Sequence, residues 1–477
     1  MKRSSGVLMH VSSLWGEYSH GSFGKAAREW IDFLCEGGFK YWQVLPFCLP
    51  DFCNSPYKSF SAFSVNPYLI DLEILYDKGL LTRDEISGAV QKTPYSCEFE
   101  RLYNERYPLL LKAAKRFNDK NAVSEYIKKN RQCEKFCEFM GRRAANGNTH
   151  WREWKTGAAD ADTVIMWQFI LYEFNTQWQE IKKYANGKGV KIIGDIPIYV
   201  DYDSSDVWAN PEMFMLDKDN IPTSAAGVPP DYFAKDGQLW GNPLYNWDVM
   251  ARDKFSWWKE RINFMTSMFD GIRIDHFRAI EAYYSIPAGE KTAKNGKWIK
   301  GPGMDFVNAV KQAADGKLII AEDLGDITPE VHKLVSDSGF PGMRVMQFGF
   351  FGDTSSPHIP HNYINNSVCY TGTHDNNTLL GYIWDLDENT RKNVLEYFGY
   401  SDQNWDRCYD TILRGMLASH GGLVIFPVQD LLLYGNDTRI NIPGKSEGNW
   451  TFRITKEQLN TVDMQKFRKW NEMYGRA

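Results

Sequence analysis

Short apolar runs alternate with amphipathic stretches along most of this chain of 477 residues. The apolar runs are bounded by Gly and Pro, as at residues 192–198 and 423–427, and they predict buried strands. Between the first two runs, residues 25–35 have helical spacing and stop at Gly37-Gly38, which predicts a helix that connects two strands. This alternation is typical of βα units around a parallel sheet.

The number of apolar runs favours one particular parallel fold. We expect eight strands, at residues 7–11, 42–46, 192–198, 269–275, 318–320, a run just before Gln347, 368–370 and 423–427. Periodicity alone does not distinguish a closed barrel from an open sheet, but a count of eight is that of the (β/α)8 or TIM barrel. We therefore predict a single catalytic barrel that spans residues 1–477.

Two long segments interrupt the alternation. Residues 75–160 are charged and have helical spacing, which predicts a helical insertion subdomain outside the barrel wall. The next helix, expected over 163–184, has apolar residues on most sides and belongs in the barrel layer. Residues 201–247 are rich in Pro, Gly, Asp and aromatic residues and predict an irregular lid after the third strand. Long irregular segments at the active-site end of a barrel are usually functional.

Charge and composition exclude two classes of partner. Lys plus Arg number 55 and Asp plus Glu number 60, for a formal net charge of −5, which provides no basic surface for nucleic acid or for a membrane. No apolar stretch resembles a signal sequence or a membrane span, so we expect a cytoplasmic protein. The eight cysteines are scattered, and no His clusters near Cys133 and Cys137, so we expect reduced thiols and no metal site.

Three acidic motifs follow predicted strands and contain Asp275, Glu322 and Asp375. The carboxyl ends of barrel strands form the active-site face, and a pair of carboxylates is the usual machinery for cleaving a glycosidic bond. Asp275 suits the nucleophile, because Arg273 points to the same face and favours its charged form. Glu322 suits the acid/base, and Asp375 suits the binding of ring hydroxyls. A strand-end Asp beside an Arg is more often a structural ion pair, but three motifs in order favour catalysis.

Aromatic residues make up 15% of the chain, with 17 Trp and 25 Tyr. Large flat side chains with a polar tip suit contacts with sugar rings, although a heavy aromatic core would produce the same composition.

These motifs resemble those of the 4-α-glucanotransferases, the amylomaltases or disproportionating enzymes allied to the α-amylase clan. The similarity covers the Asp-Gly-x-Arg-Ile-Asp-His-Phe-Arg, Ala-Glu-Asp-Leu-Gly and Thr-His-Asp-Asn motifs and runs nearly end to end. It includes the lid sequence Gly-Gln-Leu-Trp-Gly-Asn-Pro, which ordinary α-amylases lack, and Arg-Ile-Asn-Ile-Pro-Gly from Arg439. The chain departs from the family at residues 51–54, where many members carry a Gly- and Tyr-containing loop.

The resemblance implies an enzyme that transfers α-1,4-glucan segments between maltooligosaccharides by a retaining double displacement without a cofactor. Asp275 would hold the glucosyl chain before it passes to the 4-hydroxyl of an acceptor. The resemblance also implies a set of substrate-binding residues: Tyr57, Asp195, Arg273, His276 and His374 beside the cleaved bond, Gln238 and Trp240 on the acceptor side, Tyr232 at the tip of the lid, and Asn441. A hydrolase using the same carboxylates and a catalytically silent glucan-binding protein remain as alternatives.

Overall fold

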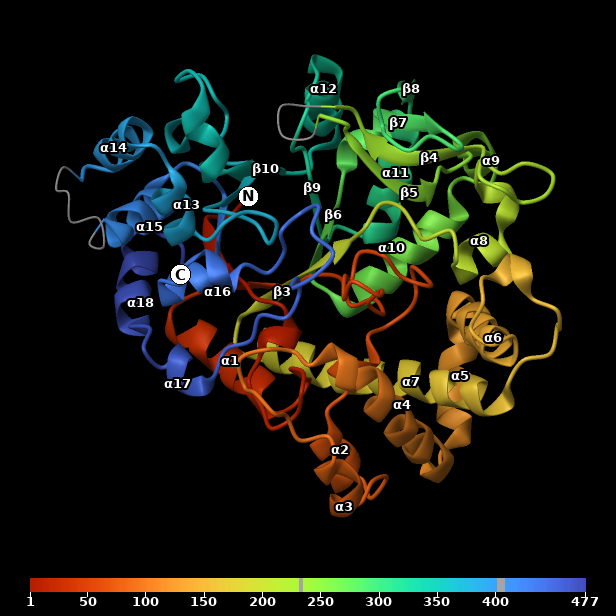
Figure 1. Cartoon of the computed structure of the whole chain (residues 1–477). Helices are drawn as coiled ribbons and strands as arrows, with labels where there is room; N and C mark the ends of the chain where they lie inside the picture. Colours follow the sequence, from red (N-terminus) through yellow and green to blue (C-terminus); the bar gives the residue numbers. More distant parts are fainter. Residues whose placement is uncertain (231–234, 401–407) are drawn as a thin grey trace.

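Eight parallel strands form a closed barrel in the computed structural model, which describes residues 1–230, 235–400 and 408–477 (Figure 1). The order around the barrel is β1-β12-β11-β10-β9-β6-β3-β2. The strands are β1 (Ser4–Leu8), β2 (Tyr41–Gln43), β3 (Lys191–Ile196), β6 (Gly271–Ile274), β9 (Leu318–Ala321), β10 (Gly342–Val345), β11 (Ser367–Tyr370) and β12 (Leu423–Pro427). The predicted (β/α)8 fold is confirmed, and β12 begins and ends where the sequence places it.

The first strand lies earlier than the sequence suggests. We expected residues 7–11, but β1 begins at Ser4, and Val11 already belongs to a short 3₁₀ turn. Ser5 is fully buried, and its hydroxyl donates to the Asn471 side chain at 2.7 Å. A side chain at Gly6 would start 2.6 Å from the carbonyl oxygen of Tyr41, so this position accepts only glycine where β1 meets β2. The start of the strand was missed because its first residues, Ser4 to Gly6, are buried but small or polar.

Helices surround the barrel and, as far as β12, connect its strands. They are α1 (Lys25–Glu36), α7 (Ala161–Gly187), α9 (Trp247–Arg252), α10 (Ser256–Met268), α11 (Gly303–Ala314), α12 (Pro329–Ser338), α13 (Leu379–Asp385), α14 (Glu388–Tyr397), α15 (Tyr409–Ala418), α16 (Val428–Leu432), α17 (Lys456–Leu459) and α18 (Met464–Met473). The longest, α7, starts after Asp160, whose side chain accepts a hydrogen bond from the Thr163 amide at 2.8 Å. Its Trp178 is fully buried and donates to the Met268 carbonyl at 2.9 Å, which attaches α7 to α10.

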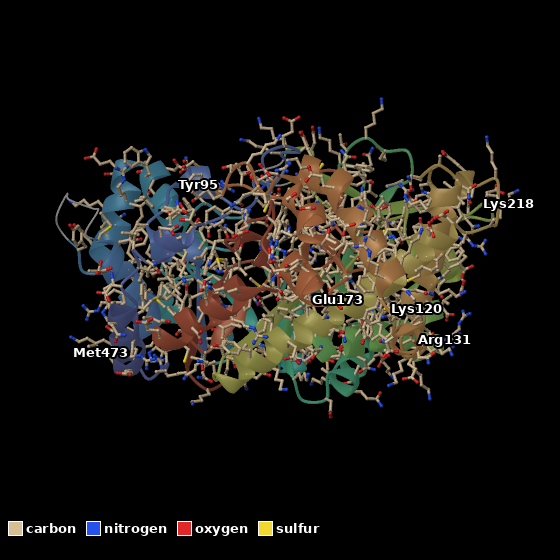
Figure 2. All side chains as sticks on the ribbon, turned by 90° about the horizontal axis from the view of Figure 1, so that it is seen from below. Tyr95, Lys120, Arg131, Glu173, Lys218 and Met473 are labelled. Carbon is tan, nitrogen blue, oxygen red and sulfur yellow. The ribbon has the colours of Figure 1, made fainter. Side chains whose placement is uncertain are left out.

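Further helices occupy the chain between β2 and α7. They are α2 (Leu72–Asp77), α3 (Arg83–Ser87), α4 (Phe99–Arg116), α5 (Lys120–Lys129) and α6 (Arg131–Ala145), and they lie together beside α7 (Figure 1). Phe136 of α6 meets Trp167 of α7 edge to face, with ring centroids 5.0 Å apart. Glu173 of α7 is buried and pairs with Lys78 at 2.6 Å; Figure 2 shows this side of the molecule from below. Apolar and ionic contacts therefore hold these helices to the barrel layer.

The segment at 201–247 is more regular than the sequence suggests. Besides α8 (Ser205–Ala209) it contains β4 (Ser224–Val228) and β5 (Gln238–Pro243). These strands join β7 (Ala282–Pro287) and β8 (Lys297–Lys300) in a second sheet of order β5-β4-β7-β8. The prediction of an irregular lid is therefore wrong for β4 and β5. Their Gly- and Pro-containing sequences show no alternation. Their conformation depends on pairing: β4 pairs with β7, which is distant in sequence, and β5 pairs with β4.

Within the described part of the chain, no helix is both long enough and apolar enough to cross a membrane.

Candidate active site

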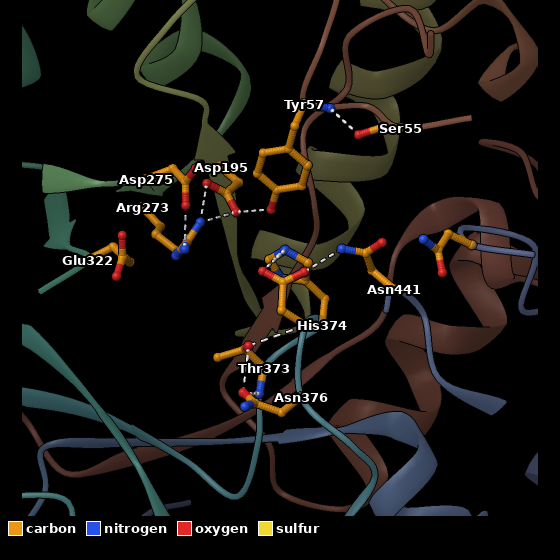
Figure 3. A network of polar contacts seen from close by, with 12 residues as sticks. Ser55, Tyr57, Asp195, Arg273, Asp275, Glu322, Thr373, His374, Asn376 and Asn441 are labelled. Atoms are coloured by element: carbon orange, nitrogen blue, oxygen red, sulfur yellow. Dashed lines mark hydrogen bonds and ion pairs between the residues drawn. The ribbon is translucent and has the colours of Figure 1, made fainter. Parts of the chain in front are cut away.

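Charged side chains converge at the carboxyl ends of β3, β6 and β9 (Figure 3). Asp195 and Arg273 lie side by side in the paired strands β3 and β6. Asp275 is the first residue after β6, and Glu322 is the first residue after β9. Asp375 belongs to residues 371–378, between β11 and α13, which we call the β11 loop. The barrel thus brings the three predicted catalytic carboxylates to one face of the molecule.

Arg273 links two of the acidic residues. One of its terminal nitrogens lies 2.9 and 2.8 Å from the two carboxylate oxygens of Asp195, and the other lies 2.6 Å from Oδ1 of Asp275. Burial acts to lower the pKa of Arg273, but the charges of Asp195 and Asp275 outweigh it and raise this pKa well above its usual range. Arg273 is therefore a permanent cation. It holds the Asp275 carboxylate, whose side chain is 30% exposed, towards the open face of the site.

Glu322 lies in the opposite kind of environment. It is 7% exposed, and its two oxygens accept hydrogen bonds from the backbone amides of His276 at 2.6 Å and Leu324 at 2.8 Å. Burial raises the pKa of Glu322 to about 8; the charge of Asp275 adds to the rise, while Arg273 and the two amides oppose it. Glu322 is thus predominantly protonated at neutral pH, as a general acid must be.

His276 follows Asp275 and connects the turn after β6 to the second sheet. Its backbone is left-handed, with φ 51° and ψ 46°, and this turn directs its amide to Glu322. Its ring meets Trp240 of β5 edge to face, with centroids 4.9 Å apart and planes at 84°. Gln238 accepts a hydrogen bond from the Trp240 indole at 3.0 Å. Burial lowers the pKa of His276 to about 4, so its ring is neutral at neutral pH. His276 therefore contacts Glu322 directly, while Trp240 and Gln238 are connected to the site through the His276 ring.

Asp375 is positioned by the segment that follows β12. The Asn441 side-chain amide donates to Oδ1 of Asp375 at 2.6 Å, and Nε2 of His374 lies 3.3 Å from Oδ2. The Arg439 guanidinium donates to the Asp375 carbonyl at 2.8 Å. Asp375 keeps 44% of its side chain exposed. Its carboxylate is therefore oriented by two neighbours and still reachable from the open face.

Aromatic rings form the wall of the site beside the ionic cluster. Tyr57 stacks on His374, with ring centroids 5.2 Å apart and planes at 13° (Figure 3). The Tyr57 hydroxyl donates to Asp195 at 2.8 Å. Trp450 lies 5.9 Å from His374 and 5.7 Å from Tyr57. Tyr57 thus lines the site.

Comparisons with known proteins agree on one family. A family model described as 4-alpha-glucanotransferase matches residues 9–459. The chain belongs to the 4-α-glucanotransferase family. This membership confirms the prediction of an enzyme that catalyses glucan transfer and does not favour the hydrolase alternative.

Members of the family match the chain over nearly its full length. The 4-alpha-glucanotransferase of Clostridium butyricum is 40% identical and covers 98% of this chain and 100% of its own. That of Streptococcus pneumoniae strain TIGR4 is 42% identical and covers 96% of this chain and 94% of its own. A solved amylomaltase from Streptococcus agalactiae, in complex with acarbose, superposes with a TM-score of 0.94 at 37% identity, and each chain is covered completely.

The sequence reasoning missed some residues of this 4-α-glucanotransferase family site. Arg439 lies in a motif that carried the resemblance, but neither Arg439 nor Trp450 was expected to contact the site. Asn441, which was expected to bind substrate, donates its amide to Asp375. Tyr232 lies outside the described residues. In the ranges that are described, no group of three or more His, Cys, Asp or Glu side chains is arranged to hold a metal ion.

Proposed function

We propose that this enzyme transfers α-1,4-glucan segments between maltooligosaccharides by double displacement, with Asp275 as nucleophile and Glu322 as acid/base. One observation carries the proposal. Two neighbouring carboxylates lie in opposite environments: Asp275 is paired with Arg273 at 2.6 Å, while burial raises the pKa of Glu322 to about 8. An ionised carboxylate beside a protonated one is what a retaining glycosidic mechanism requires.

The first half-reaction breaks the donor bond. A carboxylate oxygen of Asp275 forms a bond to the anomeric carbon, the bond from that carbon to the glycosidic oxygen breaks, and Glu322 gives its proton to that oxygen. The leaving sugar departs with a free 4-hydroxyl, and the rest of the donor stays on Asp275 as an ester. Glu322 is left as a carboxylate, held by the amides of His276 and Leu324.

The second half-reaction reverses these roles. The charge of Asp275 contributes to the raised pKa of Glu322, so formation of the ester removes that contribution and lowers the pKa. Glu322 is then suited to take the proton from an acceptor 4-hydroxyl while the acceptor oxygen bonds to the anomeric carbon and Asp275 leaves. The same residue therefore serves as acid and then as base.

We assign different roles to Asp195 and Asp375. The Asp195 side chain is fully buried and bonded to Arg273 and Tyr57, so we assign it to holding those two residues. Asp375 is half-exposed, and we assign it to ring hydroxyls of the sugar at the cleaved bond, beside the stacked Tyr57 and His374. We further propose a cytoplasmic location, supported by the charge balance and the scattered cysteines.

Incubation with maltotriose tests the proposed activity. A transferase produces glucose and a ladder of longer glucans, because each glycosyl-enzyme is resolved by a sugar hydroxyl. Products shorter than maltotriose alone would show a hydrolase, and unchanged maltotriose would show a binding protein; either result contradicts the proposal.

The pKa of Glu322 predicts the alkaline side of the pH profile. Because this pKa is raised to about 8, the proton needed for the donor bond is present below that pH and lost above it. We expect kcat/KM for maltotriose to fall tenfold per pH unit above about pH 8. A maltosyl fluoride donor, whose leaving group does not need the proton, should form the glycosyl-enzyme without this decline. The same decline with both donors, measured by pre-steady-state fluoride release, would assign the titration to another group.

Trp240 is predicted to favour sugar over water as acceptor. Its ring lies beside His276, next to the nucleophile, and provides a flat face for an acceptor glucose that water does not use. Trp240→Ala should raise the acceptor KM about tenfold, for the loss of about 1.4 kcal/mol of contact, and increase the ratio of hydrolysis to transfer. The measurement is glucose and total reducing ends released from maltotriose, with Trp154→Ala, far from β5 in sequence, as control. An unchanged ratio with both rates reduced would assign Trp240 to the donor side.

A further inference from the structure

A buried carboxylate outside the ionic cluster contacts both ends of the β11 loop. Asp430 of α16 is 1% exposed. Its Oδ2 accepts a hydrogen bond from the Thr371 hydroxyl at 2.5 Å, and its Oδ1 accepts one from the Leu379 amide at 2.8 Å. Thr371 is the first residue after β11, and Leu379 is the first residue of α13. His374 and Asp375 lie between these two contacts.

In the part of the chain that the structure describes, no ion pair involves the Asp430 carboxylate. Burial raises its pKa to about 6 against the opposing hydrogen bonds from Thr371, Leu379 and the Tyr409 side chain. A lone buried carboxylate costs free energy and is uncommon in proteins. Two of its hydrogen-bond donors, Thr371 and Leu379, belong to the β11 loop or to the residue that follows it. A carboxylate offers two acceptor oxygens, so it satisfies both donors at once.

The chain that follows α16 also contacts the middle of the β11 loop. Arg439 donates to the Asp375 carbonyl at 2.8 Å, and Asn441 donates to the Asp375 side chain at 2.6 Å. From the 3₁₀ helix that follows β10 (Met346–Phe351), Gln347 donates to the Asn377 carbonyl at 2.7 Å. The position of Asp375 relative to Asp275 is therefore defined by bonds at both ends and in the middle of the β11 loop.

We propose that Asp430 is a positioning residue for the active site, whose carboxylate fixes both ends of the β11 loop and thereby the orientation of Asp375. This inference rests on the proposed function, in which Asp375 binds the sugar at the cleaved bond. Because a displacement of about 1 Å costs a catalytic group about 100-fold in rate, loss of both bonds should reduce kcat without a comparable loss of substrate affinity.

Two substitutions at position 430 test the proposal. Asp430→Leu has a similar shape and removes both acceptors, and we expect kcat per active site to fall about 100-fold while KM rises less than threefold. Asp430→Asn keeps an oxygen for the Leu379 amide and offers an N–H to the Thr371 hydroxyl, which can accept. Its kcat should stay within about threefold of the wild type. Active sites are counted by the burst of fluoride from maltosyl fluoride, so unfolded protein does not contribute.

Control variants separate positioning from general stability. Glu173→Leu removes another buried carboxylate, which pairs with Lys78 far from the β11 loop, and should lower Tm while leaving kcat per active site unchanged. If Asp430→Leu does not fold, Thr371→Val and Thr371→Ser replace it. Valine removes only the hydroxyl and should reduce kcat about tenfold, whereas serine retains the hydroxyl and should not.

The outcomes distinguish this inference from the proposed function. Asp375→Asn is measured in parallel and should be nearly inactive. Suppose that Asp375→Asn is inactive. A wild-type kcat for Asp430→Leu would then overturn the role of Asp430 alone. Equal rates for Thr371→Val and Thr371→Ser would do the same. An Asp430→Asn variant as slow as Asp430→Leu would also overturn it, because the hydrogen bonds to Thr371 and Leu379 would then not explain the loss of kcat. A fully active Asp375→Asn would overturn the proposed function itself.

Discussion

Asp275→Asn should reduce turnover of maltotriose by about four orders of magnitude or more. The amide has the size and shape of the carboxylate but is too weak a nucleophile to form the ester with the anomeric carbon. It also loses the ion pair with Arg273, which lies 2.6 Å from Oδ1 of Asp275. Steady-state release of glucose from maltotriose measures the effect.

Asp270→Asn is a matched control for this substitution. Asp270 precedes β6 at the opposite end of the barrel, where its carboxylate accepts hydrogen bonds from the Ile192 amide and the Asn186 side chain. Its change to Asn should leave kcat within about threefold of the wild type. If Asp275→Asn is as active as Asp270→Asn, Asp275 is not the nucleophile.

Glu322→Gln should be slowed about 10³-fold or more on maltotriose, because the glycosidic oxygen then leaves without a proton. A maltosyl fluoride donor should still react, since fluoride is a good leaving group and Asp275 is intact. The covalent intermediate should then accumulate, because no base activates the acceptor hydroxyl. Mass spectrometry of the intact protein, before and after addition of the donor, measures the adduct.

Two outcomes would contradict the acid/base role of Glu322. The first is equal impairment with maltotriose and with maltosyl fluoride, which would place the defect in binding or in the nucleophile. The second is turnover of maltotriose close to that of the wild type. Glu173→Gln, which neutralises a buried carboxylate of α7, is the control and should leave both rates unchanged.

The proposed catalytic carboxylates were predictable from their position relative to the strands. Asp275 and Glu322 each follow an apolar run directly, and such runs become barrel strands that all end at one face. The contact between Arg273 and Asp275 was predictable from the alternation of side chains along a strand, which places residues two apart on the same face. The barrel followed from the same runs, and β12 was placed correctly because every one of its residues is apolar and buried.

Other parts of the structure depend on contacts that no local pattern records. The strand β4 pairs with β7, a partner distant in sequence, and β5 pairs with β4, so both belong to a sheet that no local pattern records. Asn441 contacts Asp375 across 66 residues of chain, so its sequence motif did not reveal its role. Asp430 lies three residues beyond β12, within α16, so the rule that identified Asp275 does not select it. The sequence also does not show that Asp430 is buried and accepts hydrogen bonds from Thr371 of the β11 loop and from Leu379, the residue after that loop.

The central claim is that Asp275 carries the glucan between donor and acceptor. The most direct measurement is peptide mapping, by tandem mass spectrometry, of the adduct that forms when Glu322→Gln protein reacts with maltosyl fluoride. We predict that the maltosyl group is found on Asp275 and on no other residue of the protein. A maltosyl group attached to Asp375 or any other side chain would contradict the account, as would the absence of a covalent adduct while maltosyl fluoride is consumed.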